Sequence, residues 1–158
     1  MEEIELTHRL AQLNARYARS LDSGRLEEWP EYFVDDSSYR VTTLDNHSRG
    51  LAGALIYAKG RGMLLDRVQA LRGANIYEGQ TYRHIIGTPL FERVADGAIR
   101  AETPFFVLRT MRTGAVSIFA SGTYHDRLAV PAGQPLRLAE RVVVCDSSRI
   151  DTLLAIPL

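Results

Sequence analysis

The stretch Val116-Ser117-Ile118-Phe119-Ala120-Ser121-Gly122-Thr123-Tyr124-His125 alternates between two sets of side chains. One set, at the even positions, is apolar or glycine apart from the tyrosine hydroxyl, and the other set is mostly polar. A period of two residues is typical of a strand whose two faces meet different surroundings. The sequence therefore predicts a long strand here, with one buried face and one outer face.

The segments around this stretch extend the same pattern into a sheet. Ala95-Asp96-Gly97 is a hairpin turn signal, and weaker turn signals follow at 111–114 and 130–135. They separate four predicted long strands, at 82–94, 99–111, 115–128 and 136–147. Consecutive antiparallel strands form a meander. Pro89 and Pro104 fall inside predicted strands, where proline is confined to edges and bulges, and bulges curve a sheet.

Three helices are predicted before this meander. Apolar residues at spacings of four, three, four and four residues give the first helix one buried face: Leu6, Leu10, Leu13, Tyr17 and Leu21. A short second helix over 26–33 contains Pro30, so it is kinked or begins late. A short strand at 39–44 and a polar loop at 45–53 precede the third helix, at 61–72. We therefore expect one α+β domain over 1–158, a cone with three N-terminal helices packed on a curved, mostly antiparallel sheet.

Composition excludes several classes of partner. The chain has 19 Lys and Arg and 19 Asp and Glu, so its formal net charge is zero, and the basic residues are dispersed. Nothing therefore indicates binding to nucleic acid or to an anionic membrane surface. No apolar run approaches the roughly 20 residues that span a bilayer, and the acidic start lacks signal-peptide features. We expect a cytoplasmic protein.

The residues that bind iron are too few and too scattered. A Rieske cluster needs two cysteines and two histidines, whereas Cys145 is the single cysteine. A mononuclear iron site needs two converging histidines, and the four here, His8, His47, His84 and His125, are far apart in sequence. We expect no metal and no cofactor in this chain. Cys145, which follows three valines, is predicted to be a small buried apolar side chain.

A few polar residues remain as candidates for chemistry or contacts. Asp22 at the end of the first helix and His84 in the first long strand are predicted to point into the open end of the cone, as an acid–base dyad that Tyr17, Tyr39 and Tyr57 could join. The structural alternative is favoured: His84 is a satisfied, half-buried polar group, and Asp22 caps the loop that follows it. Three further sets are expected at the surface or at subunit contacts. They are His125 with Asp126 as a solvated strand end, Arg109 and Arg112.

Four local motifs point to a known family. They are Met63-Leu64-Leu65-Asp66-Arg67-Val68, Tyr82-Arg83-His84-Ile85-Ile86, Asp126-Arg127-Leu128 and the apolar ending over 150–158. Together with the helix–sheet order, they resemble the small (beta) subunit of the aromatic-ring-hydroxylating (Rieske non-haem iron) dioxygenases. These subunits belong to the cystatin-like, nuclear-transport-factor-2-like superfamily. The length and the loop at 45–53 resemble the benzoate and anthranilate branch.

The resemblance implies a non-catalytic, structural subunit. It implies a trimer of this chain that joins three alpha subunits as α3β3, with the Rieske [2Fe-2S] cluster and the mononuclear iron in the alpha subunit. The implied reaction is dihydroxylation of an aromatic compound, such as an aromatic carboxylate. Two alternatives stay open because the fold alone does not decide function. One is a free-standing lyase or isomerase like scytalone dehydratase that uses Asp22 and His84, and the other is a small-ligand binding protein.

The run 153–158 is almost wholly apolar. Such a run needs a surface to cover, on this domain or on a neighbour. We expect its deletion to weaken assembly.

Overall fold

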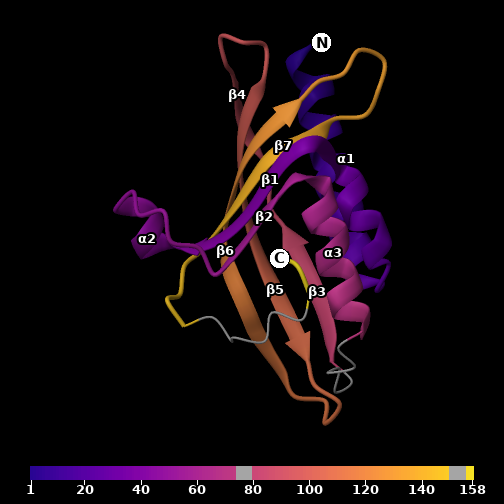
Figure 1. Cartoon of the computed structure of the whole chain (residues 1–158), viewed down its shortest axis with the longest axis vertical. Coiled ribbons are helices and arrows are strands. Elements are labelled where there is room, and N and C mark those ends of the chain that lie inside the picture. Colours follow the sequence, from indigo (N-terminus) through magenta and orange to yellow (C-terminus); the bar gives the residue numbers. More distant parts are fainter. Residues whose placement is uncertain (74–79, 150–155) are drawn as a thin grey trace.

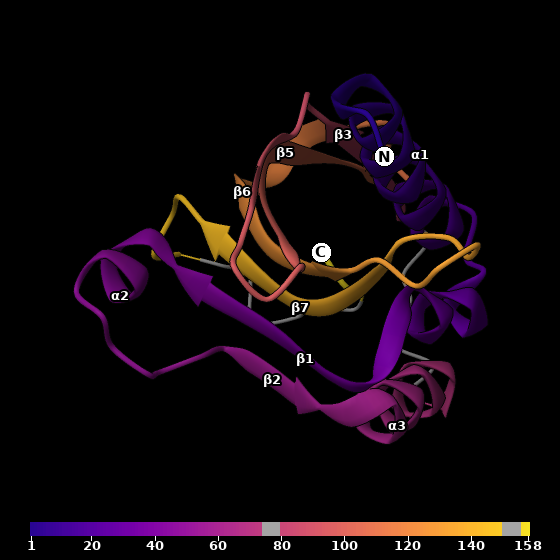
Figure 2. The same ribbon diagram turned by 90° about the horizontal axis from the view of Figure 1, so that it is seen from above.

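A strongly curved sheet, seven-stranded in the described residues, has the first helix at its open side (Figures 1 and 2). The structure is a computed structural model, which describes residues 1–73, 80–149 and 156–158. The strand order is β2-β1-β7-β6-β5-β3, and β4 pairs with β5 beyond the end of β3. All pairings are antiparallel except that of β1 with β7. The predicted α+β class with a curved, mostly antiparallel sheet is confirmed.

The elements follow one another in this order along the chain: α1 (Glu3–Asp22), the 3-10 helix η1 (Leu26–Tyr32), β1 (Phe33–Thr43), α2 (Leu44–Ser48), β2 (Ile56–Lys59), α3 (Gly60–Gly73), β3 (Thr81–Ile86), β4 (Leu90–Arg93), β5 (Ile99–Thr110), β6 (Val116–Ala129) and β7 (Arg137–Cys145).

The helices form where the sequence pattern predicts them. The five apolar residues of the first predicted stripe are all buried on α1, which lies on the concave side of the sheet (Figure 2). Pro30 lies inside η1, whose tighter 3-10 geometry suits a short segment containing proline. Helix α3 packs along β1 and η1, with Leu64 and Val68 buried.

Two predicted boundaries around β1 are wrong. This strand begins at Phe33 and not at Tyr39, so Asp35 and Asp36 are exposed strand residues. A register irregularity between Phe33 and Ser38 in the pairing with β7 accommodates them. The predicted polar loop at 45–53 contains the short helix α2, whose first turn is capped by the Thr43 hydroxyl accepting from the Asn46 N–H.

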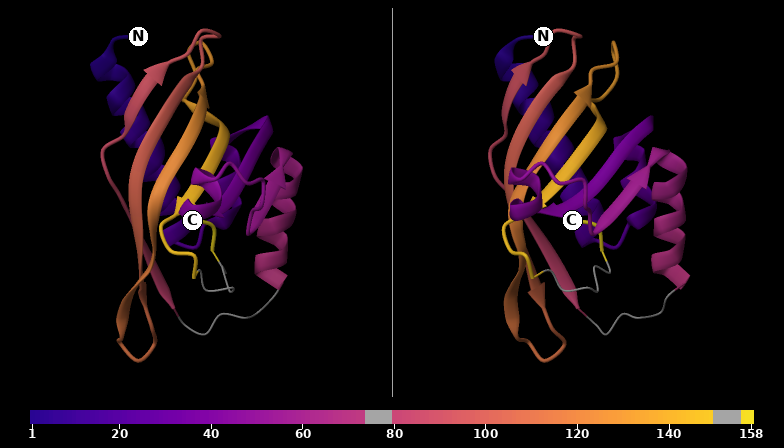
Figure 3. Two further views of the ribbon diagram at one scale, coloured as in Figure 1. Left: turned by 90° about the vertical axis from the view of Figure 1, so that its left-hand side faces the viewer. Right: turned by 60° about the vertical axis from the view of Figure 1, so that its left-hand side comes forward.

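Strand β2 was missed because four residues are too few to show a period. Figure 3 shows how it places β1 and α3 beside each other, at the side of the sheet remote from β3.

The predicted strand 82–94 is two strands, β3 and β4, which both pair with β5. The break lies opposite Pro104. The Pro104 carbonyl accepts from the Gly87 N–H at 2.8 Å. Because N–H and C=O of one strand residue point to the same side, the donor that proline lacks faces this break and not β6. A Cβ on Gly87 would lie 2.6 Å from Pro104 Cγ, so glycine is required at this crossing.

The curvature comes from bulges, as predicted, but not at the prolines. Register shifts lie between Val107 and Leu108 in the β5–β6 pairing, and between Arg127 and Leu128 in the β6–β7 pairing. Strands β6 and β7 also approach closely at Gly122, where an added Cβ would lie 1.9 Å from the Val144 carbonyl oxygen. The bent strands therefore enclose a core rich in aromatic rings: Tyr17, Trp29, Phe33, Tyr39, Phe105 and Tyr124.

Candidate functional site

Asp22 and His84 meet, as the dyad alternative predicted, whereas the favoured alternative had Asp22 capping the loop that follows it and His84 half-buried. The imidazole Nδ1 lies 2.6 Å from Asp22 Oδ1. The His84 backbone N–H also donates to the same carboxylate, at 2.9 Å to Oδ2 and 3.1 Å to Oδ1. The His84 side chain is 1% exposed and that of Asp22 is 14% exposed.

The position of this pair explains its geometry. Strand β3 is the last strand on its side of the sheet, and the His84 N–H points away from its neighbour β5. An unpaired donor at a sheet edge needs a partner or water. Asp22, the last residue of α1, supplies that partner and joins the helix to the edge strand.

The same geometry has a chemical consequence. In the neutral tautomer with its proton on Nδ1, His84 donates to the Asp22 carboxylate and its Nε2 is an acceptor. Nε2 is buried, and among the residues that the structure describes it has no hydrogen-bond partner. A groove of about 580 Å³ runs between α1 and β3, lined by this pair and by Arg19, Arg83 and Ile85 among others. The pair therefore has the arrangement of an oriented base, although it also serves as a fastening.

The three tyrosines that could have joined the pair lie elsewhere. The hydroxyls of Tyr17 and Tyr39 bind the Leu158 carbonyl oxygen, at 2.7 Å and 3.1 Å. Tyr57 lies on β2, half-exposed, with the Arg40 guanidinium 5.6 Å from its ring centre. The predicted grouping of all five residues is not formed.

A second pair, formed by the Asp126 carboxylate and the Arg141 guanidinium, lies in the core, and the sequence did not predict it. Arg141 Nε and Nη2 donate to the two carboxylate oxygens of Asp126 at 2.8 Å and 2.7 Å, and Nη2 also donates to Asn14 Oδ1 at 2.7 Å. The guanidinium lies between the rings of Tyr17 and Tyr124, 4.3 Å and 3.9 Å from their centres. Both charged side chains are at most 1% exposed. The prediction that Asp126 is a solvated strand end is wrong.

Charge pairing keeps the Arg141 guanidinium charged. Burial alone would lower the pKa of Arg141, but the Asp126 carboxylate outweighs it and raises the pKa of Arg141 above its ordinary value. Burial raises the pKa of Tyr17 and Tyr124 beside it, so both phenols stay protonated. The signal available in the sequence was the alternation of inward and outward side chains along this strand. Asp126 follows Gly122 and Tyr124 on the inward positions of the alternating strand.

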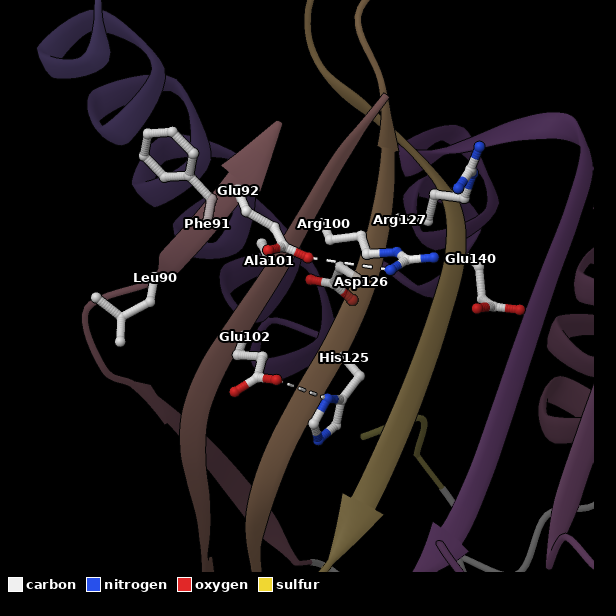
Figure 4. A pocket seen from close by; sticks show the side chains of 10 residues that line it. All are labelled: Leu90, Phe91, Glu92, Arg100, Ala101, Glu102, His125, Asp126, Arg127 and Glu140. Carbon is white, nitrogen blue, oxygen red and sulfur yellow. Dashed lines mark ion pairs between the residues drawn. The ribbon is translucent and has the colours of Figure 1, made fainter. Parts of the chain in front are cut away.

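His125 points to the outer face of the sheet, where a hollow of about 600 Å³ lies over β4 to β7 (Figure 4). The His125 Nδ1 lies 3.5 Å from Glu102 Oε1, and the ring centres of His125 and His47, which belongs to α2, are 4.7 Å apart. Burial lowers the pKa of His125; the nearby His47 adds to this, and Glu102 opposes it. Of the two arginines expected at contacts, Arg112 is exposed and Arg109 lies 5.1 Å over the Phe119 ring.

The residues do not fit an iron centre. Cys145 is 1% exposed, and burial raises the pKa of its thiol to about 12, whereas an iron–sulfur ligand must be a thiolate. Within 1–73, 80–149 and 156–158, no three His, Cys, Asp or Glu side chains are grouped so that they could hold a metal ion. In the same ranges, no helix is both long enough and apolar enough to cross a membrane.

A family model described as the ring hydroxylating beta subunit matches residues 16–152. The chain belongs to this family. It is 49% identical over 149 residues to the beta 1 subunit of the terminal oxygenase component of terephthalate 1,2-dioxygenase from a Comamonas species, covering 94% of this chain and 96% of that one. It is 36% identical over 158 residues to the anthranilate 1,2-dioxygenase small subunit of Burkholderia cepacia, covering 99% and 97%.

A solved beta subunit has the same fold. It comes from a proposed aromatic-ring-hydroxylating dioxygenase of Novosphingobium aromaticivorans, with a TM-score of 0.89 and 38% identity over 99% of this chain and 100% of that one. The prediction of a structural, non-catalytic beta subunit of a ring-hydroxylating dioxygenase is confirmed, and so is the assignment to an oxidoreductase complex.

Proposed function

We propose that this beta subunit forms a trimer that carries three alpha subunits as an α3β3 oxygenase in the cytoplasm. The alpha subunit would hold the Rieske cluster and the mononuclear iron. The observation that carries this proposal is the similarity to named oxygenase beta subunits over nearly the whole chain. Both of these relatives belong to dioxygenases named for aromatic carboxylates. We therefore propose an aromatic carboxylate as the substrate of the complex, and a single domain over 1–158.

We further propose that Asp22 and His84 fasten α1 to the edge of the sheet and take no part in turnover. Three hydrogen-bond contacts with His84 already engage the Asp22 carboxylate. In the lyase alternative Tyr17 and Tyr39 could join the dyad, whereas both hydroxyls are engaged by Leu158. No catalytic residue is therefore assigned to this chain.

Turnover of the reconstituted oxygenase tests this assignment. We expect Asp22→Asn and His84→Gln to leave turnover of the assembled complex within a few-fold of the parent. A general acid–base pair would lose about a hundredfold or more. The lyase alternative also predicts turnover by the isolated chain without reductase or NADH, and such activity, lost in either variant, would overturn the proposal.

Assembly is tested separately by analytical ultracentrifugation and elemental analysis. We expect the isolated chain to be a trimer without stoichiometric iron, and the co-expressed complex to have the mass of α3β3 with iron present. A monomer that is indifferent to the co-expressed alpha subunit would contradict the proposed assembly. Iron at one equivalent in the isolated chain would contradict the proposed division of cofactors.

The apolar run 153–158 bears on assembly in part. Residues 153–155 lie outside the described residues. Pro157 and Leu158 are buried and Ile156 is half-buried, so this part of the run is covered by its own domain. Weaker assembly after deletion of 153–158 remains a prediction, now with loss of the domain's own core as a competing cause.

A further inference from the structure

Four large apolar side chains lie together on the outer face of the sheet, toward the end that carries the β5–β6 turn (Figure 1). Their exposed fractions range from 38% for Phe106 to 68% for Ile118. Ile85 is directly opposite Phe106 in the β3–β5 pairing, whereas their neighbours His84 and Val107 are buried. Side chains alternate between the two faces of a strand, so this group faces away from the core. We call it the sheet patch, and its members are Ile85, Phe106, Val116 and Ile118.

A bulge turns two members of the sheet patch outward. The β5–β6 register shifts between Val107 and Leu108, which leaves Phe119 as an extra residue on β6. Without this extra residue, the alternation along the strand would turn Val116 and Ile118 inward. Apolar side chains that the course of the strand holds in water need a covering surface. The bulge therefore indicates that this face is an interaction surface.

The border of the sheet patch is basic. Residues 81–86 and 104–123, which build it, contain no Asp or Glu. Arg83 on β3 and Arg112 in the β5–β6 turn are both exposed. The carboxylate of Asp146, on the β7 side, already accepts a hydroxyl hydrogen bond of 2.9 Å from β6. A surface that covers this patch should therefore be apolar with a carboxylate at its border.

A second group of exposed apolar side chains lies at the other end of the strand order, beside β2. The segment that joins β1 to β2, together with β2 itself, exposes four of them by between 47% and 54%. Helix α2 in this segment also carries Asp45, which is 66% exposed and lies 3.5 Å from the Arg49 guanidinium. We call this group the loop patch, and its members are Leu44, Leu51, Leu55 and Tyr57.

The loop patch is fixed to the sheet by hydrogen bonds. The Leu55 N–H donates to the Val41 carbonyl oxygen at 2.8 Å. The Thr42 hydroxyl donates to the Gly53 carbonyl oxygen at 3.1 Å. A surface that is already ordered loses less conformational entropy when a partner binds it. The loop patch is therefore prepared for a contact with another protein.

We propose that the sheet patch of one copy packs against the loop patch of the next copy and thereby closes a trimer of this chain. This inference rests on the trimer proposed above and names its contact surfaces. A cyclic trimer requires a heterologous contact, in which two different surfaces of the chain meet. The two patches belong to different elements and lie at separate places around the curve of the sheet (Figure 2).

The two patches are complementary in chemistry. Each copy contributes four apolar side chains to the centre of the contact. At the border, Arg83 and Arg112 of one copy meet Asp45 of the next. An apolar centre within a charged border is the usual anatomy of a stable protein interface. A sheet patch paired with itself would instead bring its own arginines together, which is unfavourable.

Sedimentation of the isolated chain tests the proposal first. We expect Ile118→Glu and Leu55→Glu each to convert the trimer of the parent into monomer at micromolar concentration, because an unpaired carboxylate opposes burial in the contact. Leu90→Glu, at a side chain on β4 that is 76% exposed and outside both patches, is the matched control and should stay trimeric. All three variants should keep the far-ultraviolet circular dichroism of the parent.

Cross-linking then locates the contact, and it decides the matter if the glutamate variants do not fold. Chains with Leu55→Cys and chains with Ile118→Cys are co-expressed and treated with a short bis-maleimide. We expect covalent dimers, because a thiol of each kind then meets across a contact between copies. Either variant alone should give no covalent product, since its contact holds one thiol and the native Cys145 is only 1% exposed. Covalent dimers from one variant alone would show a self-paired patch and would overturn the proposal.

The outcomes separate this inference from the proposed assembly. A trimeric parent whose two glutamate variants also stay trimeric, or a co-expressed pair that gives no cross-link, overturns the inference and leaves the trimer intact. Glutamate variants that stay trimeric but no longer bind the co-expressed alpha subunit would assign the patches to that subunit, which also overturns it. A monomeric parent would overturn the proposed trimer and this inference together.

Discussion

Asp22 and Asp126 each bind a basic side chain, but in opposite parts of the molecule. Asp22 joins the end of α1 to His84 at the edge of the sheet, with 14% of its side chain exposed. Asp126 joins β6 to Arg141 of β7 in the core, with both side chains at most 1% exposed. Asp22 satisfies a backbone N–H as well as a side chain. Asp126 instead neutralises a charge that has no access to water.

The difference teaches which pair the fold depends on. A histidine can shed its proton and remain a neutral donor or acceptor, so the edge pair tolerates the loss of charge. Arginine stays charged at all relevant pH values, so removing either member of the core pair leaves the other as an uncompensated buried charge. We therefore expect a ranked set of effects, from the core pair to the edge pair and then to the exposed pair on the outer face.

The core pair gives the largest expected effect. Arg141→Met leaves the Asp126 carboxylate buried without its cation and should lower the free energy of unfolding by about 3–5 kcal/mol. Replacing both residues, as Asp126→Leu with Arg141→Met, should restore most of that loss. Urea unfolding of the isolated chain measures both, and Arg137→Met, a partly exposed change on the same strand, is the control. A double variant as unstable as the single one would contradict this ranking.

The rate at which Cys145 reacts with thiol reagents distinguishes the core pair from the edge pair. Its thiol is buried at the end of β7, the strand that carries Arg141, and burial raises the pKa of the thiol to about 12. The native chain should therefore react slowly with thiol reagents. Labelling at neutral pH should accelerate strongly in Arg141→Met and much less in Asp22→Ala, because only the first change opens the core. Similar labelling rates in the two variants would erase the distinction between the pairs.

The edge pair should give an intermediate effect. Asp22→Ala leaves the His84 N–H and Nδ1 without their acceptor and should cost about 1–3 kcal/mol in unfolding free energy. The loss should be smaller than that in Arg141→Met because the edge is closer to water. Asp36→Ala, at a side chain that is 92% exposed, is the matched control in the same thermal melts. A loss of stability in Asp22→Ala that is smaller than the loss in Asp36→Ala would contradict the proposal that Asp22 fastens α1 to β3.

The exposed pair, Glu102 with His125, should give the smallest effect, and it depends on pH. The folded state lowers the pKa of His125 below its ordinary value of 6.5, mainly through burial. As pH falls through 6.5, the unfolded chain binds this proton first, so stability is lost on acidification, and above pH 6.5 this loss is absent. Melting temperatures between about pH 5 and pH 7 should fall less steeply in His125→Gln than in the parent. His8→Gln, at an exposed histidine, should leave the slope unchanged.

Local patterns were enough to predict much of this fold. The period of two in β6 and the apolar stripe of α1 are properties of neighbouring residues, so they can be read without coordinates. The contact between Asp22 and His84 was foreseen as one of two alternatives, but the favoured alternative had Asp22 capping the loop that follows it. The motifs at 63–68 and 82–86 indicated the family.

Other features were decided by contacts between distant residues. The sequence could not show that β1 pairs with β7 in parallel, that 82–94 divides opposite Pro104, or that β2 exists. Asp126 and Arg141 are 15 residues apart, but their pairing depends on the register of β6 against β7 and on the bulge between Arg127 and Leu128. A shift of one residue would turn Asp126 to the outer face.

The placement of Leu158 marks the limit most clearly. Its apolar character predicts that it needs cover, but Tyr17 is 141 positions away along the chain. No local period carries information over that distance. Only the curvature of the sheet brings α1, β1 and residue 158 to one point, and burial there makes both phenols bind the Leu158 main-chain oxygen that reaches them.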